Sequence, residues 1–209
     1  MARYSDKDYW NARYAVSGTA ETALEWLQPY GAFAADLHAK VGRQGRALVV
    51  GNGTSLLAEG MTDAGFASVT AIDWAEKATE IVTARHAASP VARPGLRYLT
   101  MDAGELRFDG GTFDVVVDKA MLDCCCCGPD REAAREQAAR VVQQVHRVLR
   151  KGGQFVTITH SKETTGQRAV VYDAAPWADV AMVAVPKKAS VAESLVAADA
   201  AHYMFFLTK

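Results

Sequence analysis

The sequence has no long apolar run, no strong excess of either charge and little cysteine. No stretch approaches the roughly 18 consecutive apolar residues that a membrane-spanning helix needs. The 23 basic and 24 acidic residues give a formal net charge of −1, so overall charge favours neither nucleic acid nor an anionic membrane as a partner. The opening residues are polar and contain no apolar signal-peptide core, so secretion is not expected. We therefore expect a cytoplasmic protein.

The four cysteines form one run at residues 124–127. A disulfide framework needs cysteines spread along the chain, and a zinc site usually has a two-residue spacer and a second pair of ligands. We therefore expect no metal site and interpret the run as reduced thiols that act as small apolar side chains. The alternatives are a redox-sensitive patch or adventitious metal binding.

The composition predicts one globular domain that covers residues 1–209. Half of the residues are hydrophobic (50%) and 22% are charged, a balance that does not fit a disordered chain. No internal repeat and no low-complexity linker divides the sequence. Neither composition nor patterning predicts an oligomeric state.

Short apolar runs alternate with amphipathic stretches from about residue 45 onward. The stretches from Ser55 to Gly65, 75–87 and 130–149 have the three- and four-residue spacing of helices. For the last of them, Asp130 is the expected amino-terminal cap and Gly152 and Gly153 are the expected helix stop. The first 45 residues are rich in aromatic side chains and are expected to be helical. Buried strands are expected at 47–50, 69–72, 96–100, 113–117, 154–159, 180–185 and 203–208.

This alternation of strands and helices predicts an α/β fold with a mostly parallel sheet. In open sheets of this kind, ligands bind beyond the carboxyl ends of the strands. The residues that follow the predicted strands are therefore the first candidates for a functional site.

The turn after the first strand contains Gly51 and Gly53, and it opens a helix. Glycines there allow close approach of a ligand to the backbone, although a tight turn could need them for its own geometry. Asp73 ends the second strand, where a carboxylate can accept hydrogen bonds from a ribose diol or can cap the next helix. Together these residues favour nucleoside binding. Leu56 stands where a dinucleotide fingerprint has its third glycine, which argues against a nicotinamide cofactor.

Two further strand ends carry charged residues. Asp102, which is followed by Ala103, could accept a hydrogen bond from an adenine amine, or it could form a turn. Lys119 follows the fourth strand, where an ammonium group needs a partner such as a ligand carboxylate. The alternative for Lys119 is a surface lysine whose stem lies along the apolar surface.

These strings resemble those of class I S-adenosylmethionine-dependent methyltransferases, and more narrowly the branch of lysine methyltransferases that act on translation elongation factor 1 alpha. The resemblance covers roughly residues 8–160, with a weaker similarity at 202–209. The class-level strings are LVVGNGTS at 48–55, ID at 72–73, MD at 101–102 and FDVVVDK at 113–119. The strings typical of the branch are DYWNARY at 8–14, DKAMLD at 118–123 and RVLRKGGQF at 147–155.

The resemblance implies a Rossmann-like fold with a seven-stranded sheet, helices on both faces and an antiparallel C-terminal strand. Residues 1–44 would be a helical segment that folds over the cofactor site, and 45–209 would be the α/β core. S-adenosylmethionine would be the cofactor, and a protein lysine would be the methyl acceptor. The cofactor would be held by Trp10, Tyr14, Gly51, Gly53, Asp73, Trp74, Asp102, Ala103 and Lys119.

The chemistry of methyl transfer leaves the catalytic residues open. A lysine acceptor must lose a proton before it attacks, because an ammonium has no lone pair. Weak candidates to orient the amine or relay its proton are Asp118, Asp123, His160 and Tyr172, for each of which a structural role is an equal alternative. A small-molecule acceptor, a nicotinamide-dependent oxidoreductase and a non-catalytic binding protein remain alternative functions.

Overall fold

The computed structural model describes residues 3–17, 23–127, 129–160, 173–187 and 201–209, and its core is one seven-stranded sheet. The strands lie in the order β3-β2-β1-β4-β5-β7-β6, and β7 pairs antiparallel with both β5 and β6, whereas the pairs from β3 to β5 are parallel. This confirms the expected fold class. The strands are β1 (Arg46–Val50), β2 (Ser68–Asp73), β3 (Leu96–Thr100), β4 (Phe113–Lys119), β5 (Leu149–Thr159), β6 (Asp179–Pro186) and β7 (Ala201–Thr208).

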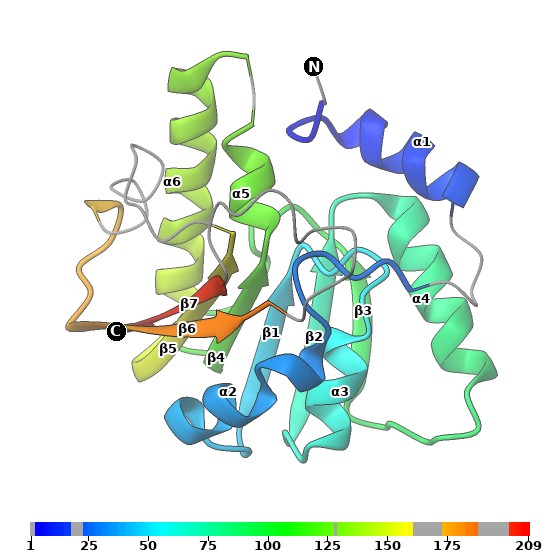
Figure 1. Ribbon diagram of the computed structural model, residues 1–209, viewed down its shortest axis with the longest axis horizontal. Coiled ribbons are helices and arrows are strands. Elements are labelled where there is room, and N and C mark those ends of the chain that lie inside the picture. Colours follow the sequence, from blue (N-terminus) through cyan, green and yellow to red (C-terminus); the bar gives the residue numbers. More distant parts are fainter. Residues whose placement is uncertain (1–2, 18–22, 128, 161–172, 188–200) are drawn as a thin grey trace.

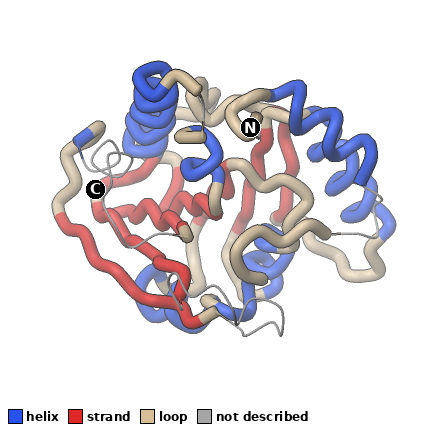
Figure 2. Tube along the Cα trace, turned by 45° about the horizontal axis from the view of Figure 1, so that its top comes forward, coloured by secondary structure: helices blue, strands red, loops and turns tan. Residues whose placement is uncertain are grey.

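Helices cover both faces of the sheet (Figures 1 and 2). Side chains alternate along β1, so that Leu48 and Val50 face one apolar cluster and Ala47 and Val49 face another. The first cluster includes α5 (Met121–Cys125) and α6 (Arg131–Val148). The second includes α2 (Ala34–Val41) and α3 (Leu57–Asp63), with the short 3-10 helix η1 (Tyr30–Ala32) beside them. Within the described residues, none of the helices is long and apolar enough to cross a bilayer.

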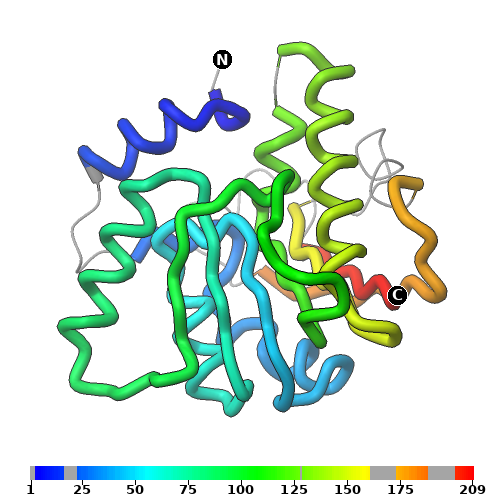
Figure 3. Tube along the Cα trace, turned by 180° about the vertical axis from the view of Figure 1, so that it is seen from behind, coloured from blue at the N-terminus to red at the C-terminus, as the bar shows by residue number. Residues whose placement is uncertain are grey.

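The N-terminal helix α1 (Lys7–Ser17) lies beyond the sheet, above α4 (Glu76–Ala88) (Figures 1 and 3). Lys7 and Asn11 both donate hydrogen bonds to the carboxylate of Glu76 at the start of α4. Between α1 and α2, residues 23–29 are not helical, so the expectation of a wholly helical N-terminal segment is wrong there. These residues run past the carboxyl ends of the strands instead.

Two local features differ from the sequence prediction. α5 occupies part of the cysteine run, where no helix was expected, because Asp118 accepts hydrogen bonds from the backbone N–H groups of Met121 and Leu122. β5 begins at Leu149 rather than at 154. The glycines of the predicted helix stop therefore form an irregularity within the strand, where the pairing of β4 with β5 shifts between Phe113 and Val115.

The predicted amino-terminal cap of α6 is confirmed. The side chain of Asp130 accepts hydrogen bonds from the backbone N–H groups of Glu132 and Ala133. We expect Asp130→Ala to lower the free energy of unfolding by about 1 kcal/mol, because two helix N–H groups lose their acceptor. Urea unfolding followed by circular dichroism measures the change. A variant as stable as the wild-type protein would show that water replaces the cap.

Candidate active site

A pocket of about 890 Å³, including its open mouth, lies at the carboxyl ends of the parallel strands. Its walls come from the turn after β1, the ends of β2 and β4, the loop after β3, helix α5 and the N-terminal segment. The residues predicted to bind the cofactor all line this one pocket: Trp10, Tyr14, Gly51, Gly53, Asp73, Trp74, Asp102, Ala103 and Lys119.

The turn after β1 needs its two glycines for conformation and for space. Gly51 has φ +63 and Gly53 has φ +53, in the left-handed region that L side chains rarely adopt. A Cβ at Gly51 would overlap the side chain of Met121, and a Cβ at Gly53 would lie 2.6 Å from the hydroxyl of Tyr14. The backbone of this turn is therefore in close contact with both α5 and α1.

Asp73 fixes that turn to the end of β2. Its Oδ2 accepts a hydrogen bond from Gly53 N at 2.7 Å, and its Oδ1 accepts one from Ala75 N at 2.9 Å. Burial raises the pKa of Asp73 to about 6 despite these bonds. The alternative that Asp73 is the amino-terminal cap of the next helix is wrong, because the cap position of α4 is Ala75. Each carboxylate oxygen keeps capacity for a second donor, such as a hydroxyl group.

The loop after β3 gives the pocket an exposed carboxylate and a small wall residue. Asp102 Oδ1 accepts a hydrogen bond from Gly104 N at 2.7 Å, so the turn role of Asp102 is confirmed. Ala103 is buried, and Trp74, which also lines the pocket, is half-buried. The lining of the pocket thus includes an aromatic face, a small side chain and an acceptor.

Aromatic side chains of the N-terminal segment form another wall of the pocket. Trp10 stacks on Tyr14 with ring centroids 5.7 Å apart, and Trp26 meets the Trp10 ring edge-on at 5.9 Å. The guanidinium of Arg13 lies over both tryptophan rings. Trp26 was not among the predicted site residues, because nothing in the spacing of an irregular segment indicates which way its side chains point.

Lys119 is buried and paired, so the surface-lysine alternative is wrong. Its side chain is 4% exposed, and Nζ donates hydrogen bonds to Glu25 Oε2 at 2.7 Å and to the carbonyl oxygen of Trp26 at 2.8 Å. Burial lowers the pKa of Lys119, and the carboxylate of Glu25 opposes that shift. The partner that such a lysine requires is thus supplied by residues 25 and 26.

The pocket offers unpaired polar atoms to a ligand. Within the described part of the chain, Trp26 Nε1 and Asn52 Oδ1 are buried without a hydrogen-bond partner, and both residues line the pocket. Buried polar groups are normally paired, so one donor and one acceptor remain for a bound molecule. With the glycine turn and the aromatic wall, this arrangement fits an aromatic, polar ligand that carries a positive charge.

Three of the weak catalytic candidates, Asp118, Asp123 and His160, are not among the residues that line the pocket. Asp118 is buried and accepts a hydrogen bond from Thr157 Oγ1 at 2.8 Å. Asp123 accepts one from Thr159 Oγ1 and pairs with Nδ1 of exposed His160 at 3.1 Å. These bonds fit structural roles, and proton relay by these residues stays a prediction. Tyr172 lies outside the described residues.

The cysteine run borders the pocket as reduced thiols. All four cysteines are free, and Cys124 and Cys125 line the pocket. Burial raises the pKa of Cys124 to about 12 and that of Cys126 to about 11. Thiols with such pKa values are protonated at neutral pH and react slowly, which fits the small-apolar interpretation of the run.

The buried carboxyl group of Asp118 makes stability depend on pH. Burial raises its folded pKa from the usual 3.8 to about 7, so the folded state binds the proton more tightly than the unfolded chain. The stability that this provides is complete below the unfolded pKa and is lost as pH rises through the folded pKa. We expect Asp118→Asn, which does not ionise, to become more stable relative to the wild-type protein between about pH 4 and about pH 7. Urea unfolding of both proteins across this range measures the difference, and a constant difference would contradict the prediction.

The argument from Leu56 against a dinucleotide is not supported by its surroundings. The Leu56 side chain is 45% exposed, so it does not separate helix α3 from the sheet. At Gly60, by contrast, a Cβ would overlap the ring of Tyr30. The close contact between α3 and Tyr30 of η1 therefore depends on Gly60, one helical turn after Leu56.

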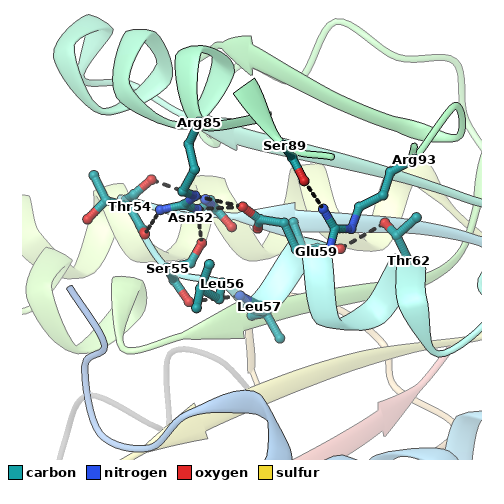
Figure 4. Close-up of polar contacts among 12 residues, drawn as sticks. Asn52, Thr54, Ser55, Leu56, Leu57, Glu59, Thr62, Arg85, Ser89 and Arg93 are labelled. Carbon is teal, nitrogen blue, oxygen red and sulfur yellow. Dashed lines mark hydrogen bonds and ion pairs between the residues drawn. The ribbon is translucent and has the colours of Figure 1, made fainter. Parts of the chain in front are cut away.

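Arg85 of α4 holds the loop between the glycine turn and α3 (Figure 4). Its guanidinium donates to the carbonyl oxygens of Thr54 and Ser55 at 2.7 and 3.0 Å and to Glu59 Oε1 at 2.6 Å. Arg85 and Glu59 expose only 15% and 8% of their side chains. Sequence reasoning missed this contact because it joins residues about 30 positions apart on two helices.

Comparison with known proteins agrees with this geometry. The chain is 33% identical over 175 residues to an eEF1A lysine and N-terminal methyltransferase of Danio rerio, and 32% identical over 162 residues to EEF1A lysine methyltransferase 4 of Mus musculus. These matches cover 84% and 75% of this chain but 24% and 62% of the relatives, so the chain spans only part of their length.

Solved structures share the fold at low sequence identity. A SAM-dependent methyltransferase from Methanosarcina mazei superposes with a TM-score of 0.62 at 15% identity, covering 83% of this chain and 96% of that one. A magnesium protoporphyrin IX methyltransferase from Synechocystis gives 0.59 at 16% identity, covering 86% and 77%. The family model described as "Methyltransferase domain" matches residues 48–157, which is more than half of the chain and runs from within β1 to within β5. The chain therefore belongs to the methyltransferase domain family.

Proposed function

We propose that this chain transfers a methyl group from S-adenosylmethionine to a lysine side chain of a protein such as elongation factor 1 alpha. The observation that carries the proposal is the single strand-end pocket that gathers all nine residues predicted to hold the cofactor. The names of the Danio rerio and Mus musculus relatives support the acceptor. A small-molecule acceptor, an oxidoreductase and a non-catalytic binding protein are not favoured by these relatives.

The residues of the pocket suit each part of that cofactor. Asp73 would accept hydrogen bonds from the ribose hydroxyls, while Trp74, Asp102 and Ala103 would hold the adenine. The aromatic wall would face the charged sulfonium, for which the negative face of an aromatic ring is a suitable neighbour. When bound, S-adenosylmethionine supplies a methyl group activated for in-line displacement. The chain's own contribution is to position the donor and to exclude water from it.

A lysine acceptor must reach this pocket as a neutral amine. Its usual pKa near 10.4 leaves it charged at neutral pH, so the site must lower that pKa or accept the proton. An apolar, aromatic surrounding lowers the pKa of an amine, because burial disfavours the charged form. Lys119 shows the same direction of shift inside this protein. Cytoplasmic location stays a prediction from the sequence.

Isothermal titration with S-adenosylhomocysteine tests the cofactor part of the proposal. We expect the wild-type protein to bind it and to bind NAD weakly or not at all. Asp73→Ala and Lys119→Met should each weaken binding, whereas Glu80→Gln, which changes an exposed side chain on α4, should not. A folded wild-type protein that binds NAD in preference would contradict the proposal.

Methyl transfer itself is tested with radiolabelled S-adenosylmethionine and purified elongation factor 1 alpha. We expect label in the factor, and mass spectrometry should place it on a lysine. Loss of the label when that lysine is replaced by arginine identifies the acceptor. Cofactor binding without transfer to this factor, but with transfer to a small molecule, would reject the protein acceptor and leave the methyltransferase activity in place.

A further inference from the structure

We infer that Glu25 is a positioning residue that fastens residues 23–29 to the strand ends and thereby sets the affinity of the pocket for its cofactor. The inference rests on the proposed function. Glu25 does not itself line the pocket, but its neighbours Leu24 and Trp26 do. Its effect on a ligand must therefore pass through them.

The carboxylate of Glu25 joins two separate parts of the site. Its Oε1 accepts a hydrogen bond from Leu56 N at 2.7 Å, just before α3. Its Oε2 accepts bonds from Ser55 Oγ at 2.9 Å and from Lys119 Nζ at 2.7 Å. Three donors, one of them charged, thus converge on one carboxylate. Such charge-assisted bonds are stronger than neutral ones, above all where the partners are shielded from water.

The residues on either side of Glu25 are held by the same elements. Leu24 N donates to Thr54 Oγ1 at 3.1 Å, and the carbonyl oxygen of Trp26 accepts from Lys119 Nζ at 2.8 Å. Three consecutive residues are therefore bonded to the loop after β1 or to the end of β4. One ammonium group serves both the Glu25 side chain and the Trp26 backbone, so loss of Glu25 weakens the placement of Trp26.

The further course of the segment is also constrained. Leu27 has φ +62, a conformation that costs energy for a residue with a side chain and persists only where the surroundings enforce it. Gln28 is buried, and its Nε2 donates to the carbonyl oxygen of Pro186 at 2.8 Å, at the end of β6. Residues 24–28 are thus held at the loop after β1, at the end of β4 and at the end of β6, and these contacts constrain the position of Trp26.

A competing interpretation predicts an effect of opposite sign. A cradle of a backbone N–H, a hydroxyl and a lysine could also hold the carboxylate of an amino-acid ligand, and Glu25 would then compete with the methionyl end of the cofactor. Removal of the Glu25 charge would strengthen cofactor binding under competition, whereas it weakens binding if Glu25 fastens the wall. We adopt the interpretation that Glu25 fixes the position of the pocket wall, because Lys119 Nζ donates hydrogen bonds both to Glu25 and to the carbonyl oxygen of Trp26.

Glu25→Gln separates the two interpretations while it keeps the shape of the side chain. We expect the Kd for S-adenosylhomocysteine to rise roughly tenfold, since a charged acceptor is lost at a partly buried site. The KM for S-adenosylmethionine should rise similarly, with kcat within about twofold, because the reacting groups are untouched. Glu80→Gln makes the same chemical change on the exposed surface of α4 and should change neither value.

A double-mutant cycle tests whether Glu25 acts through Lys119. In the Lys119→Met background, Glu25→Gln should raise the Kd for S-adenosylhomocysteine by clearly less than in the wild-type background, because the two residues share one interaction. An equal rise of the Kd in both backgrounds would show that Glu25 does not act through Lys119. Tighter binding by Glu25→Gln alone would establish competition instead, and an unchanged Kd would overturn the inference.

Hydrogen exchange of the ligand-free protein distinguishes failure of this inference from failure of the proposed function. Glu25→Gln should speed exchange of the backbone amides of residues 24–26, while β1 and β4 keep their protection. If the folded wild-type protein binds no S-adenosylhomocysteine, the proposed function and the effect on affinity both fail. Unchanged exchange in the variant, with a wild-type protein that does bind, would overturn the fastening role alone.

Discussion

Replacement of Arg85 by methionine is expected to lower the free energy of unfolding by about 3–5 kcal/mol, because it breaks a buried ion pair and leaves one charge without its partner. Glu59 is 8% exposed at its side chain, and Arg85 donates two hydrogen bonds to Glu59 Oε1. The same substitution removes the donors for the carbonyl oxygens of Thr54 and Ser55. Urea unfolding at neutral pH measures the loss.

The matched control for Arg85 is Arg93→Met. Arg93 makes a bidentate ion pair with Asp63, in which Nε lies 2.7 Å from Oδ1 and Nη2 lies 2.8 Å from Oδ2. The side chain of Asp63, however, is 48% exposed. Water replaces the lost partner there, so we expect a loss of about 1 kcal/mol or less. The double variant Arg85→Met, Glu59→Gln should recover part of the stability, since it removes the unpaired charge. Equal losses for Arg85→Met and Arg93→Met would show that burial of the Arg85 pair contributes nothing.

Gly51→Ala is expected to abolish measurable binding of S-adenosylhomocysteine. The backbone at Gly51 has φ +63, and the added Cβ would overlap Cβ and Cγ of Met121. The turn after β1 or helix α5 must then move, and both form walls of the pocket. Strain of this kind costs on the order of 1–3 kcal/mol, so a folded variant should still be obtained. Isothermal titration measures binding, and a thermal melt verifies the fold.

Gly31→Ala is the control for this substitution. Gly31 lies in η1, and a Cβ built there would meet no atom within 4 Å. We expect stability and cofactor affinity close to those of the wild-type protein. If Gly51→Ala also binds normally, the turn can relax away from α5, and the close approach of Gly51 to Met121 is not needed for the pocket.

Local sequence patterns were enough to predict where the strands lie along the chain and that the sheet is mostly parallel. Most of the strands are short apolar runs bounded on at least one side by glycine, proline or aspartate, and such runs depend on neighbours in sequence rather than on distant contacts. The strand from Leu96 to Thr100 was predicted to the residue, and the Asp130 cap was found because capping uses residues two and three positions away. The positions of Gly51, Gly53, Asp73 and Asp102 followed, since carboxyl ends of parallel strands meet at one edge.

The residues that complete those strand ends could not be predicted from local patterns, because they come together only in the folded protein. The carboxylate that pairs with Lys119 comes from Glu25, 94 residues earlier, on a segment with no periodic pattern to reveal its path. Arg85 of α4 reaches the carbonyl oxygens of Thr54 and Ser55 in the loop before α3, and α5 extends into the cysteine run, where no sequence pattern predicted a helix. The strands and their order along the chain could be predicted from residues close in sequence, because hydrophobic patterning is local. The wall of the pocket and the bonds that hold it were decided by packing, because they join residues that are distant in sequence.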